Sequence, residues 1–207
     1  MKLIKLNAID STNEYIKLNK SFFSQNSLAV YSFNQTNGKG QRGKKWITEP
    51  YKNTWISFYY RVDKPSEYTL LKINLCTTLT VLEVLKSYDI TDLKIKWPND
   101  IMSGNRKIAG ILIETTLVKN KINDLIIGIG LNVNQTDFDV IKEATSMKIL
   151  KNKSFNLHMI SKQFVEKFSS FDDKISNISK DKLIEKFCYH LFGIREKRKF
   201  AIEEKVV

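Results

Sequence analysis

The chain has few of the residues that build metal sites and disulfides. Its 207 residues include two cysteines and two histidines. The cysteines, Cys76 and Cys188, lie far apart and form no CxxC pair. Structural zinc sites use four closely spaced ligands of these types, so the composition favours buried free thiols over a disulfide or a metal site.

Long hydrophobic runs are also missing. No apolar stretch approaches the roughly 20 residues that span a bilayer. The N-terminal segment, Met1-Lys-Leu-Ile-Lys-Leu-Asn7, alternates between polar and apolar residues, whereas a signal peptide has a continuous apolar core. We therefore expect a cytoplasmic protein with no membrane partner.

Acidic residues are outnumbered, with 22 Asp and Glu against 34 Lys and Arg, giving a formal net charge of +12. Such a charge suggests a nucleic-acid-binding module, which stays open as a lesser alternative. However, the basic residues are spread along the chain, and no zinc-finger, RNP or clear helix-turn-helix pattern occurs. A lysine-rich surface that attracts phosphates or an acidic protein explains the charge without a nucleic-acid partner.

The length fits one main domain with a sizeable core. Expected strands come in hairpin-like pairs with helices beside them, without strict βαβ alternation, which predicts an α+β fold: a mixed or antiparallel sheet with helices packed on one face. Ser11 and Glu14 have the spacing of a capping box. The predicted strands cover residues 2–8, 27–34, 54–62 and 125–133, and the predicted helices cover 10–19, 67–88, 156–176 and 180–192.

Glycine is scarce, with eight residues in the chain, yet three of them fall within Gly38-Lys-Gly-Gln-Arg-Gly43. Glycine lets the backbone approach a ligand closely, and the interleaved basic residues suit an anionic group. The spacing matches neither a Walker loop nor a Rossmann fingerprint. A basic hairpin loop without a ligand is the alternative. Trp46, just beyond, could stack on a base or anchor the loop.

A second cluster lies in residues 94–114. A strand-like run ends in the corner Trp97-Pro-Asn-Asp100, and a Gly-Asn turn leads into a second apolar run that begins with Arg106 and Lys107. This hairpin places the carboxylate of Asp100 near the Lys107 ammonium. Because proline, asparagine and aspartate are all turn formers, a bend with no chemistry is the alternative.

Five motifs follow one another along the chain: Ser11-Thr-Asn13, Gln35 to Trp46, Lys96-Trp-Pro-Asn-Asp100, Arg106 to Glu114 and Gly128-Ile-Gly-Leu-Asn-Val-Asn134. Together they resemble the biotin-protein ligases, over about residues 1–190. The resemblance implies the class II synthetase-like catalytic fold over residues 1–195, with residues 196–207 as the start of an SH3-like β domain that is truncated or absent. We expect the monofunctional type, without an N-terminal DNA-binding domain.

The resemblance also implies a two-step reaction. Biotin and ATP, with Mg²⁺, give biotinyl-5′-AMP and pyrophosphate, and a lysine of a biotin carboxyl carrier protein then takes the biotinyl group. The carrier would belong to acetyl-CoA carboxylase or a related carboxylase. No tightly bound cofactor is implied, and the protein would be a monomer or a homodimer.

The resemblance also implies roles for the residues at matching positions. The catalytic residues would be Lys107, Asp100 and Lys39, and Asp100 is also the candidate Mg²⁺ ligand. The biotin-binding set is Ser11, Thr12, Asn13, Gln35, Gly38, Lys39, Gly40, Gln41, Lys107 and Gly110. The ATP-binding set is Lys39, Gln41, Arg42, Trp46, Asn99, Lys107 and Asn132.

The loop departs from the family pattern, because Lys39 and Gln41 stand where the family usually has arginines. Lysine is a point charge and glutamine is neutral, so we expect weaker retention of the adenylate. The nearest rival enzyme is a lipoate-protein ligase, which shares the adenylation chemistry. The polar set of Ser11, Thr12 and Gln35 favours biotin, since a lipoate pocket needs no partners for a ureido ring.

Overall fold

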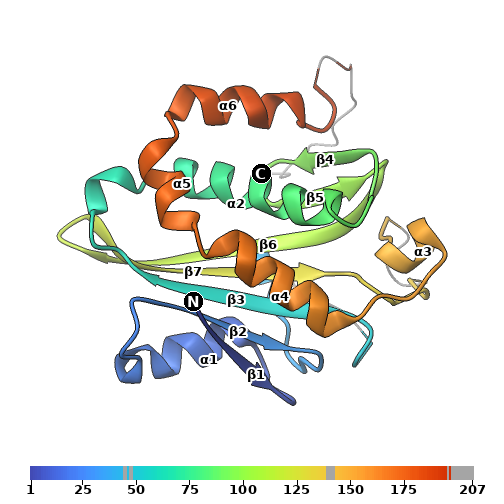
Figure 1. Cartoon of the computed structure of the whole chain (residues 1–207), viewed down its shortest axis with the longest axis horizontal. Helices are drawn as coiled ribbons and strands as arrows, with labels where there is room; N and C mark the ends of the chain where they lie inside the picture. Colours follow the sequence, from blue (N-terminus) through green and yellow to red (C-terminus); the bar gives the residue numbers. More distant parts are fainter. Residues whose placement is uncertain (44–45, 47–48, 139–142, 195, 197–207) are drawn as a thin grey trace, which may run out of the picture.

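The computed structural model describes residues 1–43, 46, 49–138, 143–194 and 196. Its centre is a seven-stranded sheet in the order β1-β2-β3-β7-β6-β5-β4 (Figure 1). β1 pairs with β2 in parallel, and the other neighbours are antiparallel, so the predicted mixed sheet is confirmed. The strands are β1 (Lys2–Leu6), β2 (Ser27–Ser32), β3 (Thr54–Arg61), β4 (Leu93–Lys96), β5 (Asp100–Ser103), β6 (Arg106–Val118) and β7 (Lys121–Leu131).

The helices largely follow the predicted segments. The longest begins after Thr69, whose side chain accepts a hydrogen bond from the Lys72 N–H and caps the helix. The single helix predicted over 156–176 is instead two helices, broken near Ser170, whose backbone is not helical (φ −102°, ψ 22°). The α-helices are α1 (Thr12–Asn19), α2 (Leu70–Lys86), α3 (Met147–Lys151), α4 (Leu157–Phe168), α5 (Phe171–Asn177) and α6 (Lys180–Tyr189), and the 3₁₀ turns are η1 (Lys20–Phe22), η2 (Gln41–Gly43) and η3 (Pro65–Glu67).

The main core lies between one face of the sheet and the helices α2, α4 and α5. Phe58 of β3 stacks on Phe168 of α4 with ring centroids 4.2 Å apart. The Tyr60 hydroxyl donates to the Phe168 carbonyl at 2.8 Å. Each large apolar side chain buried in this way stabilises the fold by about 1.5–3 kcal/mol. Helix α6 packs on the outer side of α2 (Figure 1).

Helix α1 is the exception to the prediction that helices cover one face. Its Ile16 packs in a second buried cluster with Leu28, Val30 and Tyr59. These strand residues alternate along the chain with those of the main core, and successive strand side chains point to opposite faces. α1 therefore lies on the opposite face, where its N-terminus can reach the pocket described below.

Two further expectations concern membrane segments and the C-terminal end. Among the described residues, no helix combines the length and the apolar character needed to cross a bilayer. The SH3-like segment expected at 196–207 lies outside the described residues apart from Glu196.

Candidate active site

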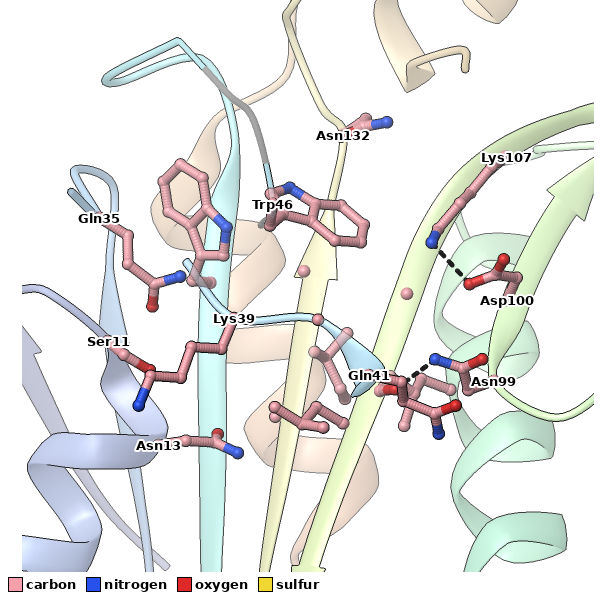
Figure 2. A pocket seen from close by; sticks show the side chains of 18 of the residues that line it. Ser11, Asn13, Gln35, Lys39, Gln41, Trp46, Asn99, Asp100, Lys107 and Asn132 are labelled. Atoms are coloured by element: carbon pink, nitrogen blue, oxygen red, sulfur yellow. Dashed lines mark hydrogen bonds and ion pairs between the residues drawn. The ribbon is translucent and has the colours of Figure 1, made fainter. Parts of the chain in front are cut away.

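A cavity of about 450 Å³ opens on the sheet between the glycine loop, the start of α1 and the corner before β5 (Figure 2). Its size lies within the range typical of small-molecule sites. The two clusters that the sequence singled out, far apart along the chain, therefore face one hollow. The predicted residues that line it are Ser11, Thr12, Asn13, Gln35, Lys39, Gly40, Gln41, Trp46, Asn99, Asp100, Lys107, Gly110 and Asn132.

One end of the cavity is a buried hydrogen-bonded cluster. The Thr12 N–H donates to Gln35 Oε1 at 2.9 Å. The Thr12 hydroxyl lies 2.7 Å from Ser57 Oγ, which in turn donates to Asn13 Oδ1 at 2.6 Å. Asn13 Nδ2 donates to Glu114 Oε2 at 2.7 Å. Ser57 is fully buried, and neither it nor Glu114 was assigned a role from the sequence.

Ser11 precedes α1 with extended backbone but makes no capping hydrogen bond through its side chain, so the predicted capping box is wrong. Glu14, the other member of that predicted box, instead lies 3.0 Å from both Lys17 and Lys39. Hydrogen bonds from these two lysines, Lys17 first, lower the pKa of Glu14 below its usual value. Because the Ser11 side chain does not cap the helix and lines the cavity, its hydroxyl can serve a ligand.

The other end of the cavity holds the Lys107 and Asp100 pair, with Nζ and Oδ1 2.6 Å apart. The strands carrying them are neighbours, but a register shift leaves Ile108 as an extra residue of β6. A strand alternates its faces, so without this bulge Lys107 and Gly110 would point to opposite faces of the sheet. The bulge brings the lysine onto the face where Asp100 and Gly110 meet the cavity.

Trp46 lies across the floor of the cavity (Figure 2). A Cβ atom added to Gly110 would come within 2.4 Å of its ring, and one added to Gly130 within 3.1 Å. Position 110 therefore requires glycine so that the indole can lie against the sheet, and a side chain at Gly130 would fit only if the ring moved by a few tenths of an ångström. Lys107 Nζ lies 4.8 Å from the centroid of this ring, a cation–π contact. The buried Trp46 Nε1 has no hydrogen-bond partner among the described residues and can donate to a ligand.

Several of the predicted site residues form hydrogen bonds with backbone groups of the protein. Asn99 Nδ2 donates to the Ile111 carbonyl at 2.9 Å, and Asn132 Nδ2 donates to the Thr145 carbonyl at 3.0 Å. These bonds leave the oxygen of each amide for other partners. Gly38 does not line the cavity. Its carbonyl accepts a hydrogen bond from the backbone N–H of Trp46 at 2.9 Å, which links the two ends of the loop.

The charged groups of the loop differ in their surroundings. Lys39 is 47% exposed at the cavity mouth, where it can move toward an anion. Arg42 belongs to the turn η2, and the position of its side chain lies outside what the structure describes. Among the described residues no group of three or more metal-binding side chains occurs, so Asp100 is a single carboxylate at the cavity.

Comparison with known proteins assigns this arrangement to a family. The model of the biotin/lipoate A/B protein ligase family matches residues 6–132. The bifunctional ligase/repressor BirA of Salmonella typhimurium is 31% identical over 140 residues, covering 67% of this chain and 43% of that protein. Biotin–protein ligase 1, chloroplastic, of Arabidopsis thaliana is 26% identical over 207 residues, covering 96% of this chain and 54% of that protein.

A solved structure agrees with these matches. The biotin protein ligase of Aquifex aeolicus, in complex with biotin and ATP, has a TM-score of 0.79 and 29% identity, covering 93% of this chain and 79% of that one. The chain spans about half the length or less of the curated relatives that it matches first. With the family model matching more than half of its residues, the chain belongs to the biotin/lipoate A/B protein ligase family.

Proposed function

We propose that the protein is an ATP-dependent biotin-protein ligase, which forms biotinyl-5′-AMP and transfers the biotinyl group to a lysine of a biotin carboxyl carrier protein. One observation carries the proposal: a single cavity has a buried amide and hydroxyl cluster at one end and the Lys107–Asp100 pair at the other. Biotin has matching ends, a ureido ring and a carboxylate. The Arabidopsis relative named biotin–protein ligase 1 and the Aquifex biotin protein ligase structure with biotin and ATP support it.

The first step joins two anions, so charge compensation is the main task of the site. A carboxylate oxygen of biotin attacks the α-phosphorus of ATP, and pyrophosphate leaves with the electron pair of the broken P–O bond. Lys107 is held between Asp100 and the Trp46 ring and can neutralise charge on the attacked phosphate. Donors fixed in advance stabilise a transition state more than mobile ones. Lys39 adds a second cation at the mouth.

The donor set at the cavity fits Mg²⁺ bound together with ATP. Mg²⁺ commonly takes one or two protein carboxylates and completes its octahedron with phosphate oxygens and water. Asp100 would supply the carboxylate, and Mg²⁺, when bound, would reduce the negative charge of the phosphates.

The second step transfers the biotinyl group. The carrier lysine attacks the acyl carbon of the adenylate as a neutral amine, the carbonyl oxygen takes up negative charge, and AMP leaves. The amine must lose a proton, and Asp100 is the carboxylate at this end of the cavity that can receive it. Lys107 then stabilises the departing AMP phosphate.

The site favours biotin over lipoate because lipoate carries a dithiolane ring, which has no use for the buried polar cluster of Thr12, Gln35 and Asn13. We place the reaction in the cytoplasm, where ATP is available; both cysteines are free, which suits a reducing compartment.

Biotin-dependent exchange between ATP and labelled pyrophosphate tests the proposal. We expect exchange with biotin, little with lipoate, and a loss of about 100-fold or more in Lys107→Ala. Lys94→Ala is the matched control, because Lys94 pairs with exposed Asp92 and does not line the cavity. Exchange with lipoate alone would assign the lipoate activity instead.

A further inference from the structure

A line of hydrogen bonds leads from Glu114, on β6, to the polar end of the cavity. It runs from the Glu114 carboxylate to the Asn13 amide, then to the Ser57 hydroxyl and then to the Thr12 hydroxyl. The heavy atoms of the three bonds lie 2.7, 2.6 and 2.7 Å apart. Asn13, Ser57 and Thr12 are at most 4% exposed, so water does not compete for the two bonds among them, while the Glu114 side chain at the outer end is 27% exposed.

The carboxylate sets the direction of every bond in the line. An ionised carboxylate only accepts, so Asn13 must turn its Nδ2 toward Glu114 and its Oδ1 toward Ser57. Ser57 then gives its one hydroxyl proton to Asn13 and can only accept from Thr12. The Thr12 proton is thereby used, and the Thr12 hydroxyl offers the cavity lone pairs alone.

The orientation of the Gln35 side-chain amide is fixed by the backbone of Thr12. The Oε1 atom of this amide accepts the Thr12 N–H at 2.9 Å, so its Nε2 stays available as a donor. The Thr12 hydroxyl also lies 3.3 Å from Gln35 Oε1, but Thr12 has one proton, and Ser57 Oγ accepts it at the shorter distance of 2.7 Å. The cavity thus presents an acceptor at Thr12 and a donor at Gln35, the complement of a ring with N–H donors and a C=O acceptor.

We propose that Glu114 is a positioning residue that fixes the hydrogen-bond direction of the ureido-binding end, so that Thr12 meets a ureido N–H as an acceptor. The inference rests on the proposed function. Glu114 does not line the cavity and acts through Asn13 and Ser57.

Lys17 makes the effect of Glu114→Gln predictable. Its Nζ lies 2.6 Å from Glu114 Oε1, and an ammonium only donates. A glutamine at position 114 would therefore turn its oxygen to Lys17 and its NH₂ to Asn13. The Asn13 amide would have to flip, and Ser57 would donate to Thr12 and occupy a lone pair that Thr12 otherwise offers the cavity. The Thr12 proton, no longer given to Ser57, would turn toward Gln35 Oε1 or into the cavity, which weakens Thr12 as an acceptor for a ureido N–H.

The test measures the biotin KM and the ATP KM in pyrophosphate exchange. We expect E114Q to raise the biotin KM about tenfold, the effect of losing one buried hydrogen bond, with the ATP KM and kcat near wild type. Asp124→Asn is the matched control: Asp124 pairs with Lys20 at 2.8 Å between η1 and β7 and has no bond to Asn13. Its biotin KM should stay unchanged.

The double variant N13D/E114Q restores the direction, because an aspartate at position 13 would accept both from the new glutamine amide and from Ser57. Its biotin KM should return toward that of wild type, an outcome that loss of packing does not produce. An E114Q protein that matches D124N, or a double variant no better than E114Q, overturns the inference while leaving the proposed function standing. Absence of biotin-dependent exchange in wild type would overturn both. If E114Q does not fold, the biotin KM of the folded double variant is compared with that of wild type: a value near wild type supports the inference, and a tenfold rise overturns it.

Discussion

Lys107 Nζ and Asp100 Oδ1 lie 2.6 Å apart because one extra residue, Ile108, shifts the register between β5 and β6. The bulge turns the lysine to the face that carries the cavity. The carboxylate orients the lysine ammonium at the cavity, and under the proposed function this pair is where a phosphate of ATP would bind.

Replacing Asp100 by asparagine tests this pair. The amide keeps the shape but removes the charge that holds Lys107 and would bind Mg²⁺, so we expect kcat/KM for exchange to fall about 100-fold. Part of the loss should return at high Mg²⁺ concentration. Asp92→Asn is the control, because Asp92 pairs with Lys94 outside the cavity. Full activity of D100N at ordinary Mg²⁺ concentration would remove Asp100 from the mechanism.

The two glycines beneath Trp46 predict a graded series. Alanine at Gly110 places a methyl group within 2.4 Å of the indole and 3.2 Å of Lys107 Cε, whereas alanine at Gly130 comes no closer than 3.1 Å to the indole. We expect G110A to lose exchange by more than about tenfold and G130A to lose less, because smaller displacements disturb Lys107 less. Exchange assays with intrinsic tryptophan fluorescence follow both. Equal losses would argue against ring displacement as the cause.

Retention of the adenylate should improve when Gln41 is replaced by arginine. Gln41 lines the cavity and brings no charge to it, whereas arginine can bind two phosphate oxygens. We expect Q41R to reduce biotin labelling of bystander proteins several-fold at equal labelling of a carrier domain. Gln25→Arg adds the same charge at an exposed position and should change nothing. Low bystander labelling by the wild type would show that Gln41 and Lys39 retain the adenylate well.

Asp172 predicts a stability effect that depends on pH. Burial raises the pKa of this carboxyl above its ordinary value of 3.8, and the hydrogen bond from Tyr68 only partly opposes this. The folded state then binds the proton more tightly than the unfolded state, so this group's contribution to stability falls as pH rises from the unfolded pKa through the folded one. The free energy of unfolding of D172N, taken relative to that of wild type, should therefore be higher at pH 7 than at pH 4. Urea unfolding at both pH values measures this, and an unchanged difference between the proteins would contradict it.

Short-range patterns predicted much of the fold and the site. Three of the eight glycines lie in residues 38–43, and this clustering predicted a ligand-binding loop. The turn formers before Asp100 predicted the hairpin that places Asp100 beside Lys107. The mixed sheet and the helical face of residues 70–86 followed from hydrophobic periodicity. These features depend on neighbours along the chain, which a single sequence does show.

Other features depend on partners far away in the sequence. Ser57 and Glu114 lie inside strands, and their role appears only when β3 and β6 meet the start of α1. The predicted capping box is wrong because Glu14 forms an ion pair with Lys39, which comes from another segment. Nor does periodicity place α1 on the opposite face of the sheet, since an amphipathic helix fits either side. Trp46 lies on the floor of the cavity because two glycines distant from it in sequence leave room for its ring.

The proposed preference for biotin over lipoate as the acid joined to AMP can be measured directly in a competition. The protein is incubated with equal concentrations of biotin and lipoate and with ATP and Mg²⁺, and the AMP-linked product is identified by mass spectrometry. We predict biotinyl-5′-AMP in large excess, and its disappearance in Lys107→Ala. Lipoyl-AMP as the main product, or no adenylate from a folded wild-type protein, would contradict the proposed function.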